Sequence, residues 1–158
     1  MSVKVYFGIG SNLNRENALR FAKSRLEKLI PDLSVSSVWA SNAVREAEPQ
    51  YYNMVAGGTT DMPIDDLFGS INVIEAEAGA ELMFNNGTNF GVKRRLDIQD
   101  YPFVLCPLCE LDPNIIHPLL KLRIGDIWNE MEPRLPEKRK VEKVSIDWDV
   151  PAPDWPED

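Results

Sequence analysis

The stretch VKVYFGIG, residues Val3–Gly10, decides the fold because it is apolar, β-branched and aromatic along almost its whole length. Such a run indicates a buried strand. A helical pattern follows it directly: Asn14 is the expected N-cap, and apolar residues then recur at helical spacing until Pro31 ends the helix. The chain therefore opens with a buried strand and an amphipathic helix.

Two further strands and a second helix are expected next. Leu33–Ala40 alternates between apolar and polar residues, and Tyr51–Thr60 is its expected partner across the polar loop Ser41–Gln50. The second helix is expected to begin at Asp61-Met62-Pro63. Beyond it we expect a loop over Glu81–Phe90, strands over Val92–Ile98, Phe103–Leu108 and Val141–Val150, and a third helix over Ile124–Met131.

The order of the main elements, β-α-β-β-α-β, predicts an α+β fold: a ferredoxin-like sheet with helices packed on it as an α/β/α sandwich. Residues 1–150 are expected to form a single domain, which the chain length of 158 residues suits. Residues 151–158, PAPDWPED, form a Pro-rich acidic tail that we expect to be mobile.

Charge and composition exclude several classes of function. The chain has 17 basic and 25 acidic residues, a formal net charge of −8, so DNA or extended RNA would be repelled. Its apolar runs are too short to cross a bilayer, and its first residues do not resemble a signal peptide. We therefore expect a cytoplasmic protein that binds neither nucleic acid nor membranes; its oligomeric state is left open.

Two basic clusters could bind a small anion such as a nucleotide, because such binding depends on local groups rather than on net charge. They are Lys93–Arg95, and Arg134 together with Lys138–Lys140. The alternative for either cluster is a solvated charged face.

Cys106 and Cys109 form a lone C-P-L-C pair. A structural zinc site needs four ligands, and the single histidine, His117, lies eight residues further on. The pair also lies inside a predicted buried strand, whereas a thioredoxin-like redox pair lies between a strand and a helix. We therefore expect two reduced, packed cysteines. With one histidine, a Ser-His or Cys-His catalytic pair is not expected either.

The segment Gly8-Ile9-Gly10-Ser11-Asn12-Leu13, which closes the first strand, argues against a dinucleotide-binding fold. The dinucleotide fingerprint needs a third glycine before the helix, and Leu13 stands in that place. It also needs an acidic residue at the end of a second parallel strand, and no obvious candidate is present.

Four short motifs stand in order along the chain. They are Gly10-Ser11-Asn12-Leu13, Ser36-Ser37 with the later Tyr51-Tyr52-Asn53, Ile74-Glu75, and FVLCPLCELDP over Phe103–Pro113. Together they resemble the 6-hydroxymethyl-7,8-dihydropterin pyrophosphokinases of folate synthesis, and their order and spacing make chance a poor explanation. The resemblance implies a ferredoxin-like α/β fold. It also implies transfer of pyrophosphate from ATP to the hydroxymethyl group of a reduced pterin, with two Mg²⁺ ions.

The resemblance implies a pterin site built from five residues. Tyr51 and Phe103 fall where the family sandwiches the pterin ring, and a flat heterocycle gains from offset aromatic stacking. Asn53 falls on the amide that reads the polar edge of the ring, since one amide can both donate and accept. Asn12 and Ser41 are placed near this pocket by the same analogy, although a turn role for Asn12 is an equal alternative.

The resemblance also implies residues for ATP and metal. Nucleotide contacts are expected from Glu75, Phe90, Lys93 and Arg94, catalytic roles from Asp97, Lys93 and Arg95, and Mg²⁺ ligation from Asp97 and Asp100.

This ATP side departs from the family pattern. The family has an Asp-x-Asp pair, and residues two apart in a strand share one face, but Gln99 stands where the second acid is expected. Asp100 could join Asp97 at one metal only through a bulge or a turn. Between Asp97 and Phe103 stand only five residues, so a family segment that supplies phosphate ligands is missing.

Three functions are compatible with these residues. The first is the family's transferase activity, weakened or altered by the shortened ATP segment. The second is a pterin-binding protein without transferase activity, which keeps Tyr51, Asn53 and Phe103 but not the ATP machinery. The third is a structural or partner-binding domain that uses its acidic tail.

Overall fold

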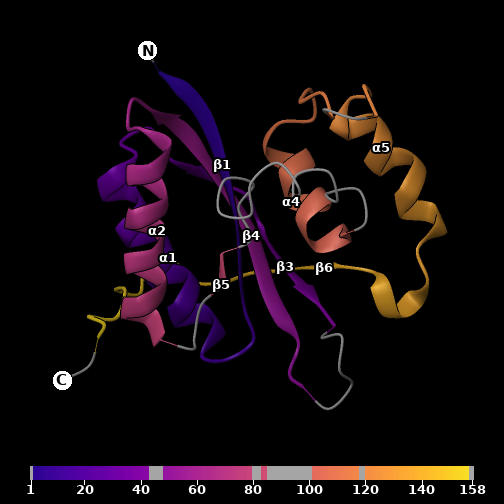
Figure 1. Ribbon diagram of the computed structural model, residues 1–158. Helices are drawn as coiled ribbons and strands as arrows, with labels where there is room; N and C mark the ends of the chain where they lie inside the picture. The colour runs from indigo at the N-terminus through magenta and orange to yellow at the C-terminus, as the bar shows by residue number, and fades with distance from the viewer. Residues whose placement is uncertain (1, 43–47, 80–82, 85–100, 118–119, 157–158) are drawn as a thin grey trace.

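The computed structural model describes residues 2–42, 48–79, 83–84, 101–117 and 120–156 (Figure 1). The strands are β1 Val3–Ser11, β2 Ser34–Val35, β3 Val38–Ser41, β4 Tyr51–Thr60, β5 Met83–Phe84 and β6 Glu142–Val144. The helices are α1 Arg15–Leu29, α2 Ile64–Ala78, α4 Pro102–Leu111 and α5 Ile124–Met131, and two 3-10 turns, Glu132–Arg134 and Glu137–Arg139, follow α5. Within the described ranges, no helix has the length and apolar content needed to span a bilayer.

The strands pair in the order β5-β1-β4-β3-β6, and every pairing is antiparallel; β2 also pairs with β4. The long strands β1 and β4 lie side by side, from Val3 opposite Thr60 to Ser11 opposite Tyr52. The order β5-β1-β4-β3 is that of a ferredoxin-like unit. The ferredoxin-like sheet predicted from the sequence is therefore confirmed, with β6 added beside β3.

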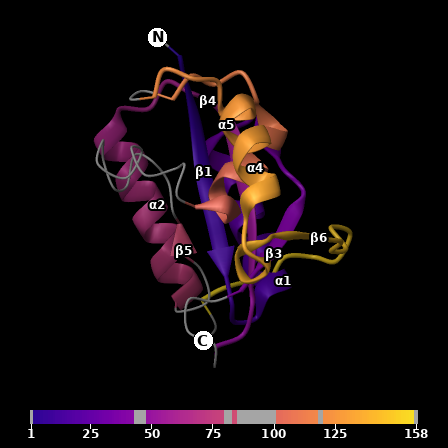
Figure 2. The same cartoon turned by 90° about the vertical axis from the view of Figure 1, so that its right-hand side faces the viewer.

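The helices form a layer on each face of this sheet. Figures 1 and 2 show α1 and α2 on one face and α4 and α5 on the other. Successive side chains of a strand point to opposite faces of the sheet, so each strand contributes to both cores. Phe7 and Ile9 of β1 belong to the core with α1 and α2, whereas Tyr6 packs with Val55 and Leu105 under α4. The predicted α/β/α sandwich is confirmed.

The first strand and helix form where the sequence predicts them, but the helix begins differently. Asn14 stands before α1 with φ 47° and ψ 45°, the left-handed region that Asn tolerates better than most residues. Its side chain makes no capping hydrogen bond, and its backbone carbonyl accepts from Ala18 N at 2.9 Å. Asn14 therefore occupies the N-cap position without acting as a side-chain cap.

The strand predicted over Leu33–Ala40 is divided into β2 and β3 by Ser36. The Ser36 hydroxyl accepts a hydrogen bond from Val55 N at 2.9 Å, while Ser36 N donates to Val55 O at 2.8 Å. The side chain thus takes a place that a backbone carbonyl would hold in a regular ladder. Its pairing partner, Tyr51–Thr60, forms with the predicted bounds.

The prediction of a strand over Phe103–Leu108 is wrong, because this segment lies in the helix α4. Pro102 occupies the first turn, where its missing N–H costs nothing. Pro107 lies inside the helix and cannot donate to the carbonyl of Phe103, which is tolerated here in a short helix buried against the sheet. A continuous apolar run fits a buried helix as well as a buried strand, so periodicity alone does not separate them.

The other predicted elements are mostly confirmed. The second and third helices form as α2, after Pro63, and as α5, Ile124–Met131. Part of the predicted loop Glu81–Phe90 is the short strand β5, and the predicted strand Val92–Ile98 lies outside the described residues. The edge strand predicted over Val141–Val150 is limited to β6, Glu142–Val144.

The chain leaves β6 to reach α1, and this shortens the edge strand. The backbone carbonyl of Asp147 accepts a hydrogen bond from Arg20 Nε at 2.9 Å. The Trp148 ring then lies 5.4 Å from the ammonium of Lys23, also on α1. Both contacts direct the last described residues across the edge of the sheet toward the α1 and α2 layer.

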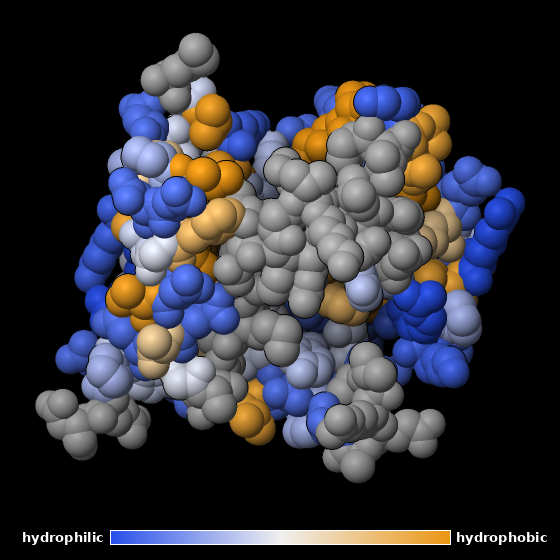
Figure 3. Space-filling model, in the orientation of Figure 1, coloured by the Kyte–Doolittle hydropathy of each residue, from blue (hydrophilic) through white to orange (hydrophobic). Residues whose placement is uncertain are grey.

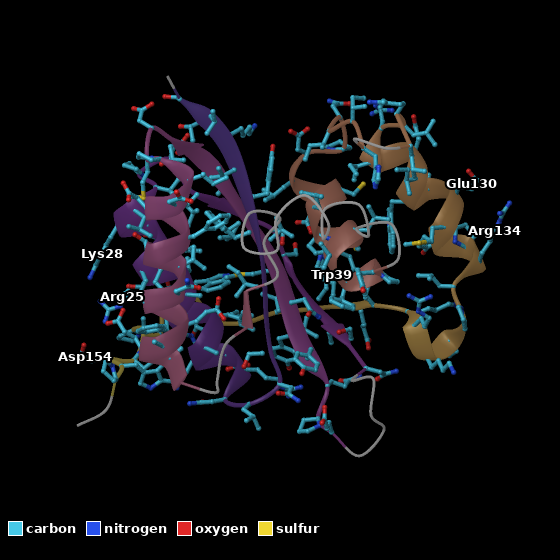
Figure 4. All side chains as sticks on the ribbon, viewed as in Figure 1. Arg25, Lys28, Trp39, Glu130, Arg134 and Asp154 are labelled. Carbon is cyan, nitrogen blue, oxygen red and sulfur yellow. The ribbon has the colours of Figure 1, made fainter. Side chains whose placement is uncertain are left out.

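Trp155 of the Pro-rich tail is buried in the core, so the prediction that the tail is mobile is wrong for its described part, residues 151–156. Trp155 is 7% exposed, and its ring centroid lies 5.1 Å from that of Phe21. Arg25 Nη2 donates to the Trp155 carbonyl at 3.0 Å. Figure 4 shows Arg25 and Asp154 together at this side of the molecule. One aromatic residue among prolines is enough to fasten the segment to α1.

The loop between α4 and α5 is organised around the buried side chain of His117. Its Nδ1 accepts from Leu120 N at 3.1 Å, and its backbone N–H donates to Leu122 O at 2.8 Å. Burial lowers the pKa of His117 below its ordinary value. Ile116, Leu120 and Leu122 remain exposed, and Figure 3 shows hydrophobic surface over this loop. The histidine therefore acts as a structural acceptor.

Replacing Trp155 with alanine should lower the free energy of unfolding by about 3 kcal/mol, because a buried indole is lost from the α1 core. Urea denaturation measures the change. The matched control is Trp148→Ala, since Trp148 is 36% exposed and should cost less than about 1 kcal/mol. Equal stabilities for the two variants would show that the tail is not docked in solution.

The free energy of unfolding should fall as the pH decreases below about 6.5, the ordinary pKa of histidine. The folded state lowers the pKa of His117, so below that pH the unfolded chain binds the proton first and is favoured. Above it, both states are neutral and the full stability is present.

Chemical denaturation between pH 5 and 7.5 measures this dependence. His117→Asn is the control, because its Oδ1 can replace Nδ1 as the acceptor and does not titrate. The chain has one histidine, so a slope that persisted in His117→Asn would contradict the assignment.

Candidate functional site

The polar centre of the candidate site is Asn53, which lies on β4 in the middle of the sheet and is 5% exposed. Its register partners are Gly10 of β1 and Trp39 of β3. Asn53 Nδ2 donates to the Trp39 carbonyl at 2.9 Å and to Ser41 Oγ at 2.8 Å. Both bonds use Nδ2, so Oδ1 is the acceptor that Asn53 can offer to a ligand.

Gly10 is required by the close approach of this amide. A Cβ at Gly10 would lie 3.0 Å from Asn53 Oδ1 and 3.8 Å from Cδ1 of the Tyr51 ring. The Tyr51 ring and the Asn53 amide therefore border the same space above β1. This gives a physical reason for glycine at the start of the Gly-Ser-Asn-Leu motif.

The other predicted pterin residues on the sheet lie at the same end of it. Tyr51 stands directly opposite Ser41, and it is two residues from Asn53 and so on the same face. Ser41 is buried and Tyr51 half-buried. Asn12 directly follows β1, whose last residue pairs with Tyr52, and it is half-buried. The structure thus gathers four of the five predicted pterin residues at one sheet end.

The fifth residue, Phe103, lies on α4, which covers the face that carries Asn53. Leu105 and Leu108 of α4 pack with Val55 of β4 in a cluster of buried apolar residues. Phe103 itself is half-buried, and its ring centroid is 5.6 Å from that of Tyr101. The helix that the sequence analysis predicted as a strand therefore places Phe103 over the predicted pterin face.

The position of α4 is fixed by the carboxylate of Glu110. Its Oε2 accepts from the backbone N–H and the hydroxyl of Ser37 at 2.9 and 2.7 Å, and its Oε1 accepts from Trp39 Nε1 at 3.0 Å. Glu110 is exposed overall, but desolvation by the groups packed against it acts to raise its pKa; the hydrogen bonds outweigh this effect and hold the pKa below its usual value. Glu110 is therefore ionised at neutral pH.

A second carboxylate, Asp112, ties the end of α4 to β1. Tyr6 Oη donates to Asp112 Oδ2 at 2.7 Å, and the Lys4 ammonium lies 3.9 Å from the same oxygen. Burial and the hydrogen bond to Asp112 raise the pKa of Tyr6 well above its usual value, so this phenol stays protonated and remains a donor.

These two anchors set the direction of α4. Trp39, the partner of Glu110, pairs with Asn53 of β4, and Tyr6, the partner of Asp112, pairs with Gly57. From Glu110 to Asp112 the chain therefore runs along β4 in the direction from Asn53 to Gly57. The earlier turns of α4, which carry Phe103, accordingly lie toward the end of β4 that carries Tyr51.

The roles of Trp39 and Glu110 were missed in the sequence analysis. In the sequence, Trp39 belongs to an alternating strand pattern and Glu110 to the motif Phe103–Pro113, and neither pattern indicates a role in the site. Their contact joins residues 71 apart in the chain. A pairing of that length has no signal in a single sequence.

Most of the predicted nucleotide and metal residues lie outside the described part of the chain. This holds for Phe90, Lys93, Arg94, Arg95, Asp97 and Asp100. Glu75 is described: it is half-buried on α2, the helix against the opposite face of the sheet from Asn53. Among the described residues, no group of three or more His, Cys, Asp or Glu side chains could hold a metal ion. The metal ligands therefore stay predictions.

The described basic cluster forms a solvated face. Arg134 follows α5 and lies 3.6 Å from Glu130 (Figure 4). Lys140 lies 3.3 Å from Glu137, and all four residues are exposed. Such exposed pairs contribute little to stability. The other cluster, Lys93–Arg95, is outside the described residues.

The two cysteines are free, as predicted, although they lie on a helix rather than in a strand. Cys106 is buried and Cys109 half-buried. Burial raises the pKa of Cys106 to about 12 and also raises that of Cys109. Thiols that stay protonated at neutral pH are poor nucleophiles, so neither is a catalytic candidate.

A polar hollow of about 340 Å³ lies on the other side of the sheet, at the start of α1. Its lining residues are Asn14, Arg15, Glu16, Asn17, Arg20 and Tyr52. The Arg15 guanidinium stacks 4.0 Å from the Tyr52 ring, and Arg20 donates to Asn17 and Glu16. These groups are already engaged with one another, so the Asn53 face is the stronger candidate.

Comparisons with known proteins point to one enzyme family. A family model described as 7,8-dihydro-6-hydroxymethylpterin-pyrophosphokinase (HPPK) matches residues 6–113. The folic acid synthesis protein FOL1 of Dictyostelium discoideum is 30% identical over 160 residues, which cover 89% of this chain and 24% of that protein. The 2-amino-4-hydroxy-6-hydroxymethyldihydropteridine pyrophosphokinase of Aquifex aeolicus (strain VF5) is 27% identical over 141 residues, 74% of this chain and 85% of that enzyme.

Asn53→Ala should lower the free energy of unfolding by about 2 kcal/mol, because the Trp39 carbonyl and the Ser41 hydroxyl lose a buried donor. Thermal and urea denaturation measure this loss. Asn42→Ala is the control: Asn42 also donates to a backbone carbonyl, that of Lys138, but it is exposed and should cost about 0.5 kcal/mol or less. Similar losses in both variants would contradict a buried, organising role for Asn53.

Proposed function

The chain belongs to the 7,8-dihydro-6-hydroxymethylpterin-pyrophosphokinase family, and on that premise we propose that it transfers pyrophosphate from ATP to a 6-hydroxymethyl-dihydropterin. The observation that carries the proposal is the buried amide of Asn53 on the sheet face covered by α4. Because the chain spans about a quarter of FOL1, the activity of that whole protein is not transferred to it. A cytoplasmic location also remains a prediction.

The pterin ring would bind between Tyr51 on the sheet and Phe103 on α4. Each offset stack with an aromatic ring contributes about 0.5–1.5 kcal/mol beyond burial. Asn53 Oδ1 would accept from an N–H on the polar edge of the ring, while Nδ2 holds the amide plane through Trp39 and Ser41. A fixed amide discriminates against heterocycles that lack the matching donor.

In this reaction the main task of the protein is to position two substrates, the pterin and ATP. The pterin hydroxyl oxygen attacks the β-phosphorus of ATP and releases its proton, the bond from that phosphorus to the bridging α–β oxygen breaks, and AMP leaves. Positioning and charge neutralisation supply most of the rate enhancement in transfers of this kind. Lys93, Arg94 and Arg95 are the proposed phosphate contacts, with Glu75 and Phe90 at the nucleotide.

Mg²⁺ is proposed as the metal, with ATP as co-substrate. When bound, it would neutralise the phosphate charge during transfer. Asp97 is the proposed ligand and Asp100 the second candidate, and Gln99 stands where the second acid of the pair is expected. With one carboxylate, the ion would be held largely by the nucleotide phosphates.

A second candidate function is a pterin-binding protein without transferase activity. It is favoured by two sequence facts: Gln99 replaces the second acid of the expected pair, and five residues separate Asp97 from Phe103. Both losses concern ATP and metal, and both leave the Asn53 face intact.

Isothermal titration of the purified chain distinguishes these functions. A 6-hydroxymethylpterin is titrated first alone, and then with Mg²⁺ and a non-hydrolysable ATP analogue. Binding of both ligands supports the transferase, and binding of the pterin alone supports the second function. If neither binds, the proposal is wrong and only the fold is shared with the family.

Phe103→Ala should weaken pterin binding at least tenfold, because one of the two stacking rings and its buried area are lost. Titration calorimetry measures the affinity, and circular dichroism confirms the fold. Phe68→Ala is the matched control, since Phe68 is also half-buried on a helix but lies on α2, across the sheet. Unchanged pterin affinity in folded Phe103→Ala would exclude the stacking role.

Asp97→Asn should abolish the formation of AMP from ATP and pterin, because the best remaining metal ligand loses its charge. Pterin affinity without nucleotide should stay unchanged. Chromatographic quantification of AMP measures the activity. Wild-type turnover by Asp97→Asn would place the metal site elsewhere.

A further inference from the structure

We propose that Glu110 is a positioning residue of the pterin site, whose carboxylate holds the Trp39 indole and the α4 helix so that Phe103 stands over the Asn53 face. The inference rests on the proposed function for the identity of the ligand. The geometry of the contacts that carry it does not depend on that function.

The first observation is the number of donors that converge on one carboxylate. Glu110 receives three hydrogen bonds, all between 2.7 and 3.0 Å, from Ser37 N, Ser37 Oγ and Trp39 Nε1. These donors come from the start of β3 and the residue before it, while Glu110 comes from the last turn of α4. The carboxylate therefore joins the helix to the strand, with Oε2 accepting from Ser37 and Oε1 from Trp39.

The second observation is that Glu110 and Phe103 lie on the same stripe of α4. They are seven residues apart, so their side chains differ by about 20° around the helix axis and are about 10 Å apart along it. The side of α4 that Glu110 fastens to Ser37 and Trp39 is thus the side that carries Phe103. A rotation of the helix that released Glu110 would move the Phe103 ring with it.

The third observation is that Trp39 contacts both Glu110 and Asn53, the residue proposed to bind the polar edge of the ligand. Its indole Nε1 donates to Glu110, and its backbone carbonyl accepts from Asn53 Nδ2 at 2.9 Å. Trp39 and Asn53 are register partners on neighbouring strands. The Lys143 ammonium lies 5.4 Å from the Trp39 ring centroid and is the partner of Trp39 on β6. Figure 4 shows Trp39 at the α4 side of the strands.

The loss of Glu110 should reorient α4 without detaching it. Leu105 and Leu108 remain packed on Val55, and Tyr6 still donates to Asp112 at the end of the helix. These contacts hold the centre of α4 and Asp112, the residue that follows its last turn. On the stripe that carries Phe103, Pro107 is buried as well, but only Glu110 is seen to add directional hydrogen bonds there, to Ser37 and Trp39. The effect of Glu110 should therefore appear in ligand affinity more than in global stability.

The test compares Glu110→Gln with Glu142→Gln. The amide keeps the size of the carboxylate but offers one acceptor oxygen in place of two. Glu142→Gln removes the same charge next to Lys143 in the sequence, on β6, at a position that is exposed like Glu110 but belongs to a strand and not to α4. Glu110→Gln should weaken binding of a 6-hydroxymethylpterin about tenfold, by calorimetry, and Glu142→Gln less than twofold. Equal affinities for the two variants overturn the proposal.

A double-variant cycle shows whether Glu110 acts through Trp39. Trp39→Phe removes the Nε1 donor and leaves Ser37 bonded to Glu110, so it should weaken pterin binding on its own. Adding Glu110→Gln to Trp39→Phe should then cost less than Glu110→Gln costs alone. Additive losses overturn the link. Trp39→Phe also serves as the second variant if Glu110→Gln does not fold.

A measurement without ligand separates this proposal from the proposed function. In ¹H–¹⁵N spectra, the indole N–H resonance of Trp39, assigned with Trp39→Phe, should move and exchange faster in Glu110→Gln and not in Glu142→Gln. An unmoved resonance overturns the positioning role even if the wild type binds pterin. If the resonance moves in Glu110→Gln but the wild type binds no pterin, the proposed function is wrong, and with it the pterin part of this inference.

Discussion

The docking of α4 against β4 is the constraint on which the rest of the candidate site depends. Leu105 and Leu108 bury their side chains against Val55, and each such burial stabilises the fold by about 1.5–3 kcal/mol. Apolar packing alone leaves a short helix free to rotate and slide. The hydrogen bonds of Glu110, together with that of Tyr6 to Asp112, limit that freedom, because a hydrogen bond has a direction and a length that apolar contacts lack.

The two faces of the sheet differ in what they carry: one carries most of the apolar core, and the other carries the candidate site. The face under α1 and α2 carries the larger core, which the tail completes through Trp155. The face under α4 carries the smaller cluster, and at its end the polar group of Asn53, Ser41 and Tyr51. The larger share of the buried apolar residues thus lies on one face, and the other face can hold polar groups at little cost to the stability of the fold.

Local patterns in the sequence were sufficient for the strands β1 and β4 and for the helices α1, α2 and α5, because period and turn residues distinguish those elements. They missed β5, which lies in a predicted loop. They failed for Phe103–Leu108, an apolar run with an internal proline that fits either state, and for the tail, whose Trp155 finds Phe21 far along the chain. Asn53 and Tyr51 were found through a family resemblance. The Glu110–Trp39 contact was not, since it exists only in three dimensions.

A crystal structure of the chain with a bound 6-hydroxymethylpterin would show where the ring binds. We expect the ring on the β4 face that carries Asn53, under α4, with its polar edge toward Oδ1 and the Phe103 ring stacked on it. A pterin bound instead in the polar hollow beside Arg15 and Tyr52, across the sheet, would contradict the account.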